Sequence, residues 1–174
     1  MGGAIHNSWT SVSQGLTIGG GSVSVKETMT MAPGIYVFDG TAIELVNSSS
    51  RITGTGVFMY FMGNPSQTYF HPKTGIVNLI APSAGTPPYP DWHPRMVIWI
   101  DNCSIFDSQG NSAFYVEGIF YAPCSTLYLH GNPYGDAIRG QVIAAVIDIR
   151  GNVNFHVSYE DYVATLRYEL WLIE

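Results

Sequence analysis

The most chemically mixed stretch of the sequence is a loop spanning residues 91–95, with His71 in the loop before it. An acid, a histidine and an arginine beside an aromatic ring are side chains that bind a sugar or a metal ion. No further metal ligand stands at a recognisable spacing, so we expect no metal and no cofactor. The candidate ligand site, with a plain surface loop as the alternative, consists of Asp91, Trp92, His93 and Arg95.

Four carboxylates fall on or beside expected strands and could serve a polysaccharide-cleaving groove: Asp101, Asp107, Glu117 and Asp148. Such chemistry needs two carboxylates about 5–10 Å apart across a sugar. These four are separated along the chain, and nothing pairs Asp101 with Asp107. The seven Lys plus Arg residues are too few to line a groove for acidic polymers. We therefore expect solvated corners, no catalytic residue and a protein that is not an enzyme.

Composition favours a single all-β domain. Of the 174 residues, 46% are apolar and only 11% are charged, against roughly 25% charged in typical domains. Nineteen Gly, ten Pro, eleven Tyr and eight Phe favour strands and turns. A net charge of −6 without a basic cluster argues against nucleic acid. No apolar run approaches the roughly 20 residues of a membrane helix, so we expect membrane contact only through an absent N-terminal anchor.

A repeated unit organises the chain. Residues 118–132 and 140–152 each hold a glycine, an apolar run, a small-residue break, an alternating strand and a Gly-Asn corner. Similar run openers recur at Gly34, Gly56, Gly75, Arg95, Gly118 and Gly140, with gaps of 22, 19, 20, 23 and 22 residues. One coil per repeat, with parallel strands stacked about 4.8 Å apart, satisfies this period. The sequence thus predicts an all-β, single-stranded parallel β-helix of about six to seven coils.

The expected domain organisation has three parts. Residues 1–15 form an N-terminal lead-in or cap, and residues 16–160 form the β-helix. In residues 161–174 apolar and polar residues alternate with period 2, which predicts a C-terminal strand. Several β-helix runs are apolar on both sides, as at Ile35 and Tyr36, so their outer face needs a cover. That cover is either the C-terminal strand, which could instead cap the last coil, or a partner chain.

Cys103 and Cys124 are the only cysteines, and they follow the openers Arg95 and Gly118 by eight and six residues. Stacked coils lie within the roughly 4.4–6.8 Å between Cα atoms that a disulfide requires. A disulfide would indicate an oxidising compartment. Two small thiols buried in the core are an equal alternative. A nucleophilic cysteine is disfavoured, because the pattern places no histidine beside either thiol.

Several of these runs resemble one family. Successive coils at residues 33–36, 54–57, 78–82, 118–123, 127–132 and 140–144, with the ending at 172–174, are similar to the C-terminal β-helix domain of TadG-like and PilX-like pilus-assembly and minor-pilin proteins. The resemblance covers roughly residues 30–174. It implies a domain outside the membrane, usually preceded by an anchoring helix, with no catalytic residues to transfer. A second resemblance is to ice-binding and adhesin-type β-helix domains, which lack counterparts here to their long helix and threonine column.

Together these features predict a non-catalytic, extracellular or cell-surface β-helix domain of a bacterial-type envelope, acting in pilus or filament assembly or in adhesion. The expected partners are other protein subunits, including further copies of this chain, and a glycan surface. The alternative functions are a carbohydrate-binding or carbohydrate-active β-helix protein and an ice-binding-type adhesin domain.

Overall fold

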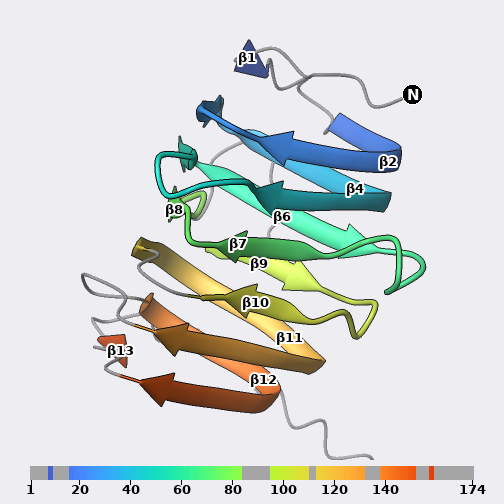
Figure 1. The fold of residues 1–174 in the computed structure, drawn as a ribbon. Helices are drawn as coiled ribbons and strands as arrows, with labels where there is room; N and C mark the ends of the chain where they lie inside the picture. The colour runs from blue at the N-terminus through green and yellow to red at the C-terminus, as the bar shows by residue number, and fades with distance from the viewer. Residues whose placement is uncertain are drawn as a thin grey trace, which may run out of the picture.

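The structure, a computed structural model, describes residues 8–9, 16–83, 95–109, 113–131, 138–151 and 157–158. Every regular element in these ranges is a strand, and the strands pair in parallel as stacked rungs (Figure 1). This confirms the predicted all-β parallel β-solenoid. The described chain makes about five turns, slightly fewer than the six to seven predicted. None of the described residues forms a helix long and apolar enough to cross a membrane.

The rungs make three faces, which we number in chain order. The first face stacks β1 (Ser8–Trp9), β3 (Thr28–Met31), β5 (Arg51–Thr55), β8 (Ile76–Ile80), the start of β11 (Ala113–Gly131), the start of β12 (Ile138–Gly151) and β13 (Val157–Ser158).

The second and third faces share several long strands that bend at a corner. The second face stacks the first halves of β2 (Leu16–Val25) and β4 (Gly34–Leu45), then β6 (Val57–Met62), β9 (Met96–Ile100) and the middle parts of β11 and β12. The third face stacks the second halves of β2 and β4, then β7 (Phe70–Lys73), β10 (Phe106–Ser108) and the ends of β11 and β12.

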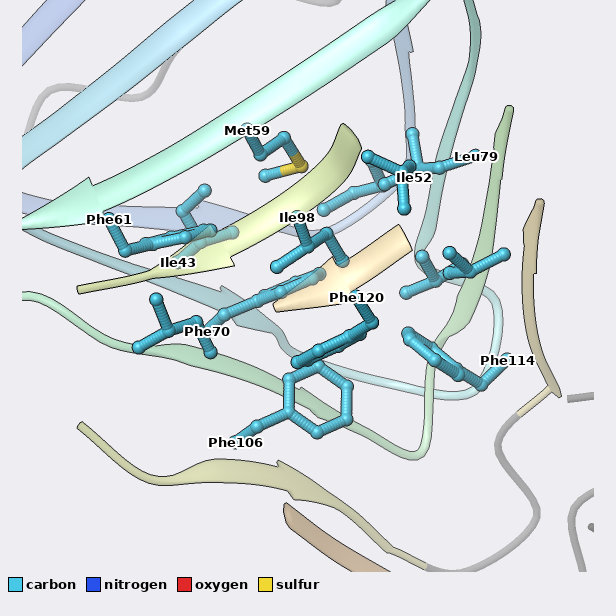
Figure 2. Close-up of a cluster of buried hydrophobic side chains, with 14 of the residues drawn as sticks. Ile43, Ile52, Met59, Phe61, Phe70, Leu79, Ile98, Phe106, Phe114 and Phe120 are labelled. Atoms are coloured by element: carbon cyan, nitrogen blue, oxygen red, sulfur yellow. The ribbon is translucent and has the colours of Figure 1, made fainter. Parts of the chain in front are cut away.

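Alternating side chains create the core. Alternate residues of β3 and β7 are buried, because successive side chains of a strand point to opposite sides. Inside the solenoid the buried side chains form one cluster whose phenylalanines lie one after another along the axis (Figure 2). Ring centroids of neighbours are 4.8, 5.7, 5.4 and 5.1 Å apart along the series Phe38, Phe61, Phe70, Phe106 and Phe120.

The glycine openers mark close approach between successive rungs. Gly118 and Gly140 are register partners, with φ of 135° and 138°. A Cβ on Gly140 would collide with the carbonyl oxygen of Gly118, and a Cβ on Gly118 would collide with Ala81 and with the Arg95 carbonyl. Glycine therefore opens these runs because neither the φ nor the space suits a side chain.

One opener was assigned to the wrong face. Gly75 directly precedes β8 of the first face, whereas Gly34, Arg95 and Gly118 open or precede strands of the second face. The chain between Gly56 and Arg95 is thus a single long turn, and counting it as two made the predicted number of coils too high. The Gly-Asn corners are also of two kinds. Gly63 follows a second-face strand, whereas Gly131 and Gly151 pair at the end of the third face.

The predicted terminal segments fall largely outside the described residues. Of the lead-in over residues 1–15, only Ser8–Trp9 is described, as strand β1. The predicted C-terminal strand over residues 161–174 lies wholly outside.

Candidate functional site

The predicted ligand loop is only partly described: Asp91, Trp92 and His93 lie outside the described residues. Arg95 is half-buried just before β9, with a φ of 66°, and its carbonyl accepts a 2.8 Å hydrogen bond from the N–H of Ile119. It borders an open cavity of about 200 Å³ that is also lined by Ile80, Ala81, Pro82, Ser83, Glu117 and Gly118. The structure thus gives Arg95 a role in the backbone of the turn between the first and second faces.

His71 lies apart from Arg95 in register. It sits on β7 of the third face, opposite Glu44, whereas Arg95 precedes a strand of the second face. The half-buried imidazole stacks on Tyr69 with ring centroids 4.2 Å apart. The structure therefore does not join these two members of the candidate site on one face.

The four carboxylates of the hypothetical groove are each engaged by a neighbour. Asp101 accepts a 2.9 Å hydrogen bond from the Tyr60 hydroxyl, Asp107 one of 2.6 Å from Gln109, Glu117 one of 3.0 Å from Tyr115, and Asp148 two of 2.8 and 2.7 Å from Arg150. The hydrogen bonds from Arg150 lower the pKa of Asp148. A general acid in a glycosidase needs the opposite, a raised carboxyl pKa.

The outer side of the third face carries a ladder of mutually paired polar groups. Glu44 accepts hydrogen bonds of 2.9 Å from Lys73 Nζ and 3.0 Å from the Tyr69 hydroxyl, and the bond from Lys73 lowers its pKa. Further along, Tyr128 pairs in register with Asp148, which lies 3.6 Å from His130 Nε2. Opposite charges one rung apart stabilise a parallel stack, so this ladder neutralises itself. Sequence reasoning missed the Glu44–Lys73 contact, because 29 residues separate the partners.

Burial of His71 makes folding sensitive to acid. Desolvation lowers the pKa of its imidazole below the ordinary 6.5, although Asp107 and Glu44 oppose the shift. The unfolded chain therefore binds a proton more readily, so the free energy of unfolding should fall as pH drops below about 6.5. Replacing His71→Phe retains the stack on Tyr69 and removes the titration. Chemical denaturation at pH 7.5 and 5.5 should show a smaller loss for the variant, and equal losses would contradict this role.

The outer side of the second face carries aromatic rings in register. Tyr60 pairs with Trp99, and Trp99 with Tyr121. The ring centroids of both pairs are 5.3 Å apart, with interplanar angles of 57° and 86°. All three side chains are half-buried. We call Tyr60, Trp99 and Tyr121 the aromatic column.

Aliphatic residues extend the aromatic column in both directions, since Val37 pairs with Tyr60, and Tyr121 pairs with Ile143. Burial and the hydrogen bond to Asp101 raise the pKa of Tyr60 to about 12, so its hydroxyl stays protonated near neutral pH. The sequence indicated strands apolar on both sides, but it did not reveal this column. Its members lie 39 and 22 residues apart, so only the register of the coils brings them together.

The two cysteines form a disulfide. Cys103 and Cys124 are joined with Cα atoms 4.8 Å apart. Both residues are exposed, so the bond ties the corner after β9 to the corresponding corner of β11 at the surface. Of the two alternatives that the sequence left open, the structure has the disulfide, and it lies outside the core.

No three His, Cys, Asp or Glu residues gather into a metal site within the part of the chain that the structure describes. No protein-family model matches the chain, and no curated protein or solved structure matches it either. The comparisons therefore show no family, and the candidate surface rests on geometry alone.

Proposed function

We propose that this chain is a non-catalytic, extracytoplasmic β-helix domain of a pilus-associated or cell-surface protein, acting in assembly or adhesion through its second face. The observation that carries the proposal is the aromatic column. Tyr60, Trp99 and Tyr121 lie in register on the outer side of one parallel sheet, continued by Val37 and Ile143.

The column has the composition of a protein-binding surface. Parallel sheets are usually covered on both sides, and a contiguous apolar strip on an outer side commonly marks an interaction site. Tyr and Trp are enriched among residues that dominate binding energy, because each supplies a large rigid area with a polar group at its edge. The Tyr60 hydroxyl, bound to Asp101 at 2.9 Å, provides such a polar edge. The proposed occupant is an apolar surface of another protein subunit.

Two further observations support the compartment and the absence of catalysis. A surface disulfide such as Cys103–Cys124 persists in oxidising compartments and is rare in the cytosol. The carboxylates Asp101, Asp107, Glu117 and Asp148 are held by hydrogen bonds to neighbouring side chains. This arrangement suits a surface that stabilises the solenoid better than one that transfers protons.

The test is a pair of matched aromatic truncations on different faces. Trp99→Ala removes the central ring of the aromatic column, whereas Tyr128→Ala removes a half-buried ring from the outer side of the third face. Truncating a central aromatic anchor should weaken binding by about 2 kcal/mol, or roughly 30-fold. We expect Trp99→Ala to reduce self-association, measured by light scattering, or attachment to cell and inert surfaces, while Tyr128→Ala leaves both unchanged.

Two results would contradict the proposal. One is a wild-type chain that remains a monomer and attaches to no surface, and the other is equal loss of association in the two variants. Circular dichroism and thermal unfolding of both variants check that the solenoid remains folded, so a loss of binding can be attributed to the missing ring.

Carbohydrate binding is the second candidate, and the same aromatic column favours it. Aromatic rings at 5.3 Å steps along one axis can contact successive units of a linear glycan, with the Tyr60–Asp101 pair as a polar neighbour. Screening the wild-type chain, Trp99→Ala and Tyr128→Ala on a glycan array separates the candidates. Glycan binding lost only in Trp99→Ala would favour the carbohydrate, and release of reducing sugar would overturn the non-catalytic proposal.

A further inference from the structure

The last described rung leaves core positions open. On β11, Leu127 and Leu129 point inward and are 0% and 4% exposed. Their register partners on β12, Ile147 and Ile149, occupy the same inward positions but are 41% and 44% exposed. Beyond this part of β12, at the lower end of the stack in Figure 1, the described residues provide no further rung on the third face. Apolar side chains in such positions need a covering rung.

The opposite end of the third face is closed. Val23 and Val25 lie on the first described rung of this face, as partners of Ile43 and Leu45, and they are only 5% and 6% exposed. Head-to-tail stacking of two copies would need an open rung at both ends. This asymmetry favours a cover supplied by the chain itself over a second copy.

The register of the following strand indicates which residues form the cover. β13 begins a new rung on the first face, with Val157 opposite Ile138 and Ser158 opposite Arg139, an offset of 19 residues. The same offset on the third face places Leu166 over Ile147 and Tyr168 over Ile149. It also places Arg167 over Asp148 and Glu169 over Arg150, so that both outward pairs join opposite charges.

Neighbouring registers do not give this match. A shift of two residues keeps the same side chains inward, as a strand of period 2 requires. An offset of 21 places Glu169 over Asp148, and an offset of 17 places Arg167 over Arg150, so each brings like charges together. Like charges directly opposite destabilise a sheet. Charge and alternation thus agree on the offset that β13 already has.

We propose that residues 166–169 form the next rung of the third face, paired in parallel with residues 147–150 of β12. This rung covers Ile147 and Ile149 and occupies the hydrogen-bonding edge of β12, which would otherwise be available to a strand from another molecule. The solenoid then ends in a closed rung, and its contacts with partners are directed to the second face.

Engineered disulfides in the full-length chain test the register. The native Cys103–Cys124 bond shows that corresponding positions on neighbouring turns can be joined, with Cα atoms 4.8 Å apart. Ile149→Cys with Tyr168→Cys should therefore cross-link within one chain and leaves both charge pairs intact. The matched control, Ile149→Cys with Leu166→Cys, joins diagonal positions about 7–8 Å apart, beyond the usual disulfide range. Peptide mapping by mass spectrometry without reductant identifies the bonds.

Each outcome decides the proposal. A bond between positions 149 and 168 at the mass of a monomer, with much less bonding in the control, supports it. Equal yields in the two variants, no bond in either, or a bond between two chains overturns it, the last because a second copy would then supply the cover.

Charge reversal provides an independent measurement. Exchanging the two tail charges, with Arg167→Glu and Glu169→Arg, should reduce formation of the 149–168 bond by roughly tenfold, because two favourable pairs become repulsive. Adding Asp148→Arg and Arg150→Asp should restore the yield. A tail exchange without effect, or one that the second exchange does not rescue, overturns the proposed register even where a bond forms.

Discussion

Replacing both Cys103→Ser and Cys124→Ser is expected to lower the free energy of unfolding by about 3 kcal/mol. The bond joins residues 21 apart and so closes one complete turn of the solenoid. Cross-linking restricts the unfolded chain, and a loop of this length accounts for a change of this size. Since folded domains are stable by only about 5–15 kcal/mol, the loss is a large share of the total. Equilibrium unfolding in urea measures it.

Reductant supplies the control for this prediction. The described residues contain no free cysteine, so reducing the wild-type chain should reproduce most of the loss, while the double serine variant should not respond. Both corner residues are exposed, which allows the substitutions without opening a cavity in the core. A wild-type chain whose unfolding is unaffected by complete reduction would contradict the prediction. The result would also show how far folding depends on an oxidising compartment.

The fold could be predicted from sequence where a turn contains no insertion. Between Gly118 and Gly140 the chain makes one uninterrupted turn, and the two glycines are register partners. The same reasoning misassigned Gly75, because a glycine before an apolar run looks alike on every face. Between β6 and β9 the chain holds a loop, β7, β8 and residues 81–95, so the spacing there reports two insertions and not one coil.

The candidate surface could not be predicted for a related reason. The aromatic column requires Tyr60, Trp99 and Tyr121 to share one outward position, and their separations of 39 and 22 residues hide that relation. Likewise, Glu44 and Lys73 meet only after β4 and β7 stack. The disulfide was within reach of sequence reasoning, because Cys103 and Cys124 stand one turn apart, but their exposure at a corner depends on where the strands end.

Truncating Phe106→Ala should be the most damaging single change in the core, with a loss of about 3–5 kcal/mol in the free energy of unfolding. The side chain is fully buried, and its ring centroid lies 5.4 Å from Phe70, 5.0 Å from Phe114 and 5.1 Å from Phe120 (Figure 2). These contacts connect rungs above, below and across the solenoid. Alanine would leave a cavity that the rigid stack of hydrogen-bonded rungs can only partly close.

The adjacent residue offers a matched control. Ile105 is 47% exposed at the outer side of the same segment, so Ile105→Ala should change stability by no more than about 0.5 kcal/mol. Because a solenoid is held together by contacts between neighbouring turns, the cavity at Phe106 should also weaken the coupling between its two halves. Urea unfolding followed by circular dichroism should then show a lower midpoint and a broader transition for Phe106→Ala alone. Equal effects of the two variants would contradict the central position of Phe106 in the core.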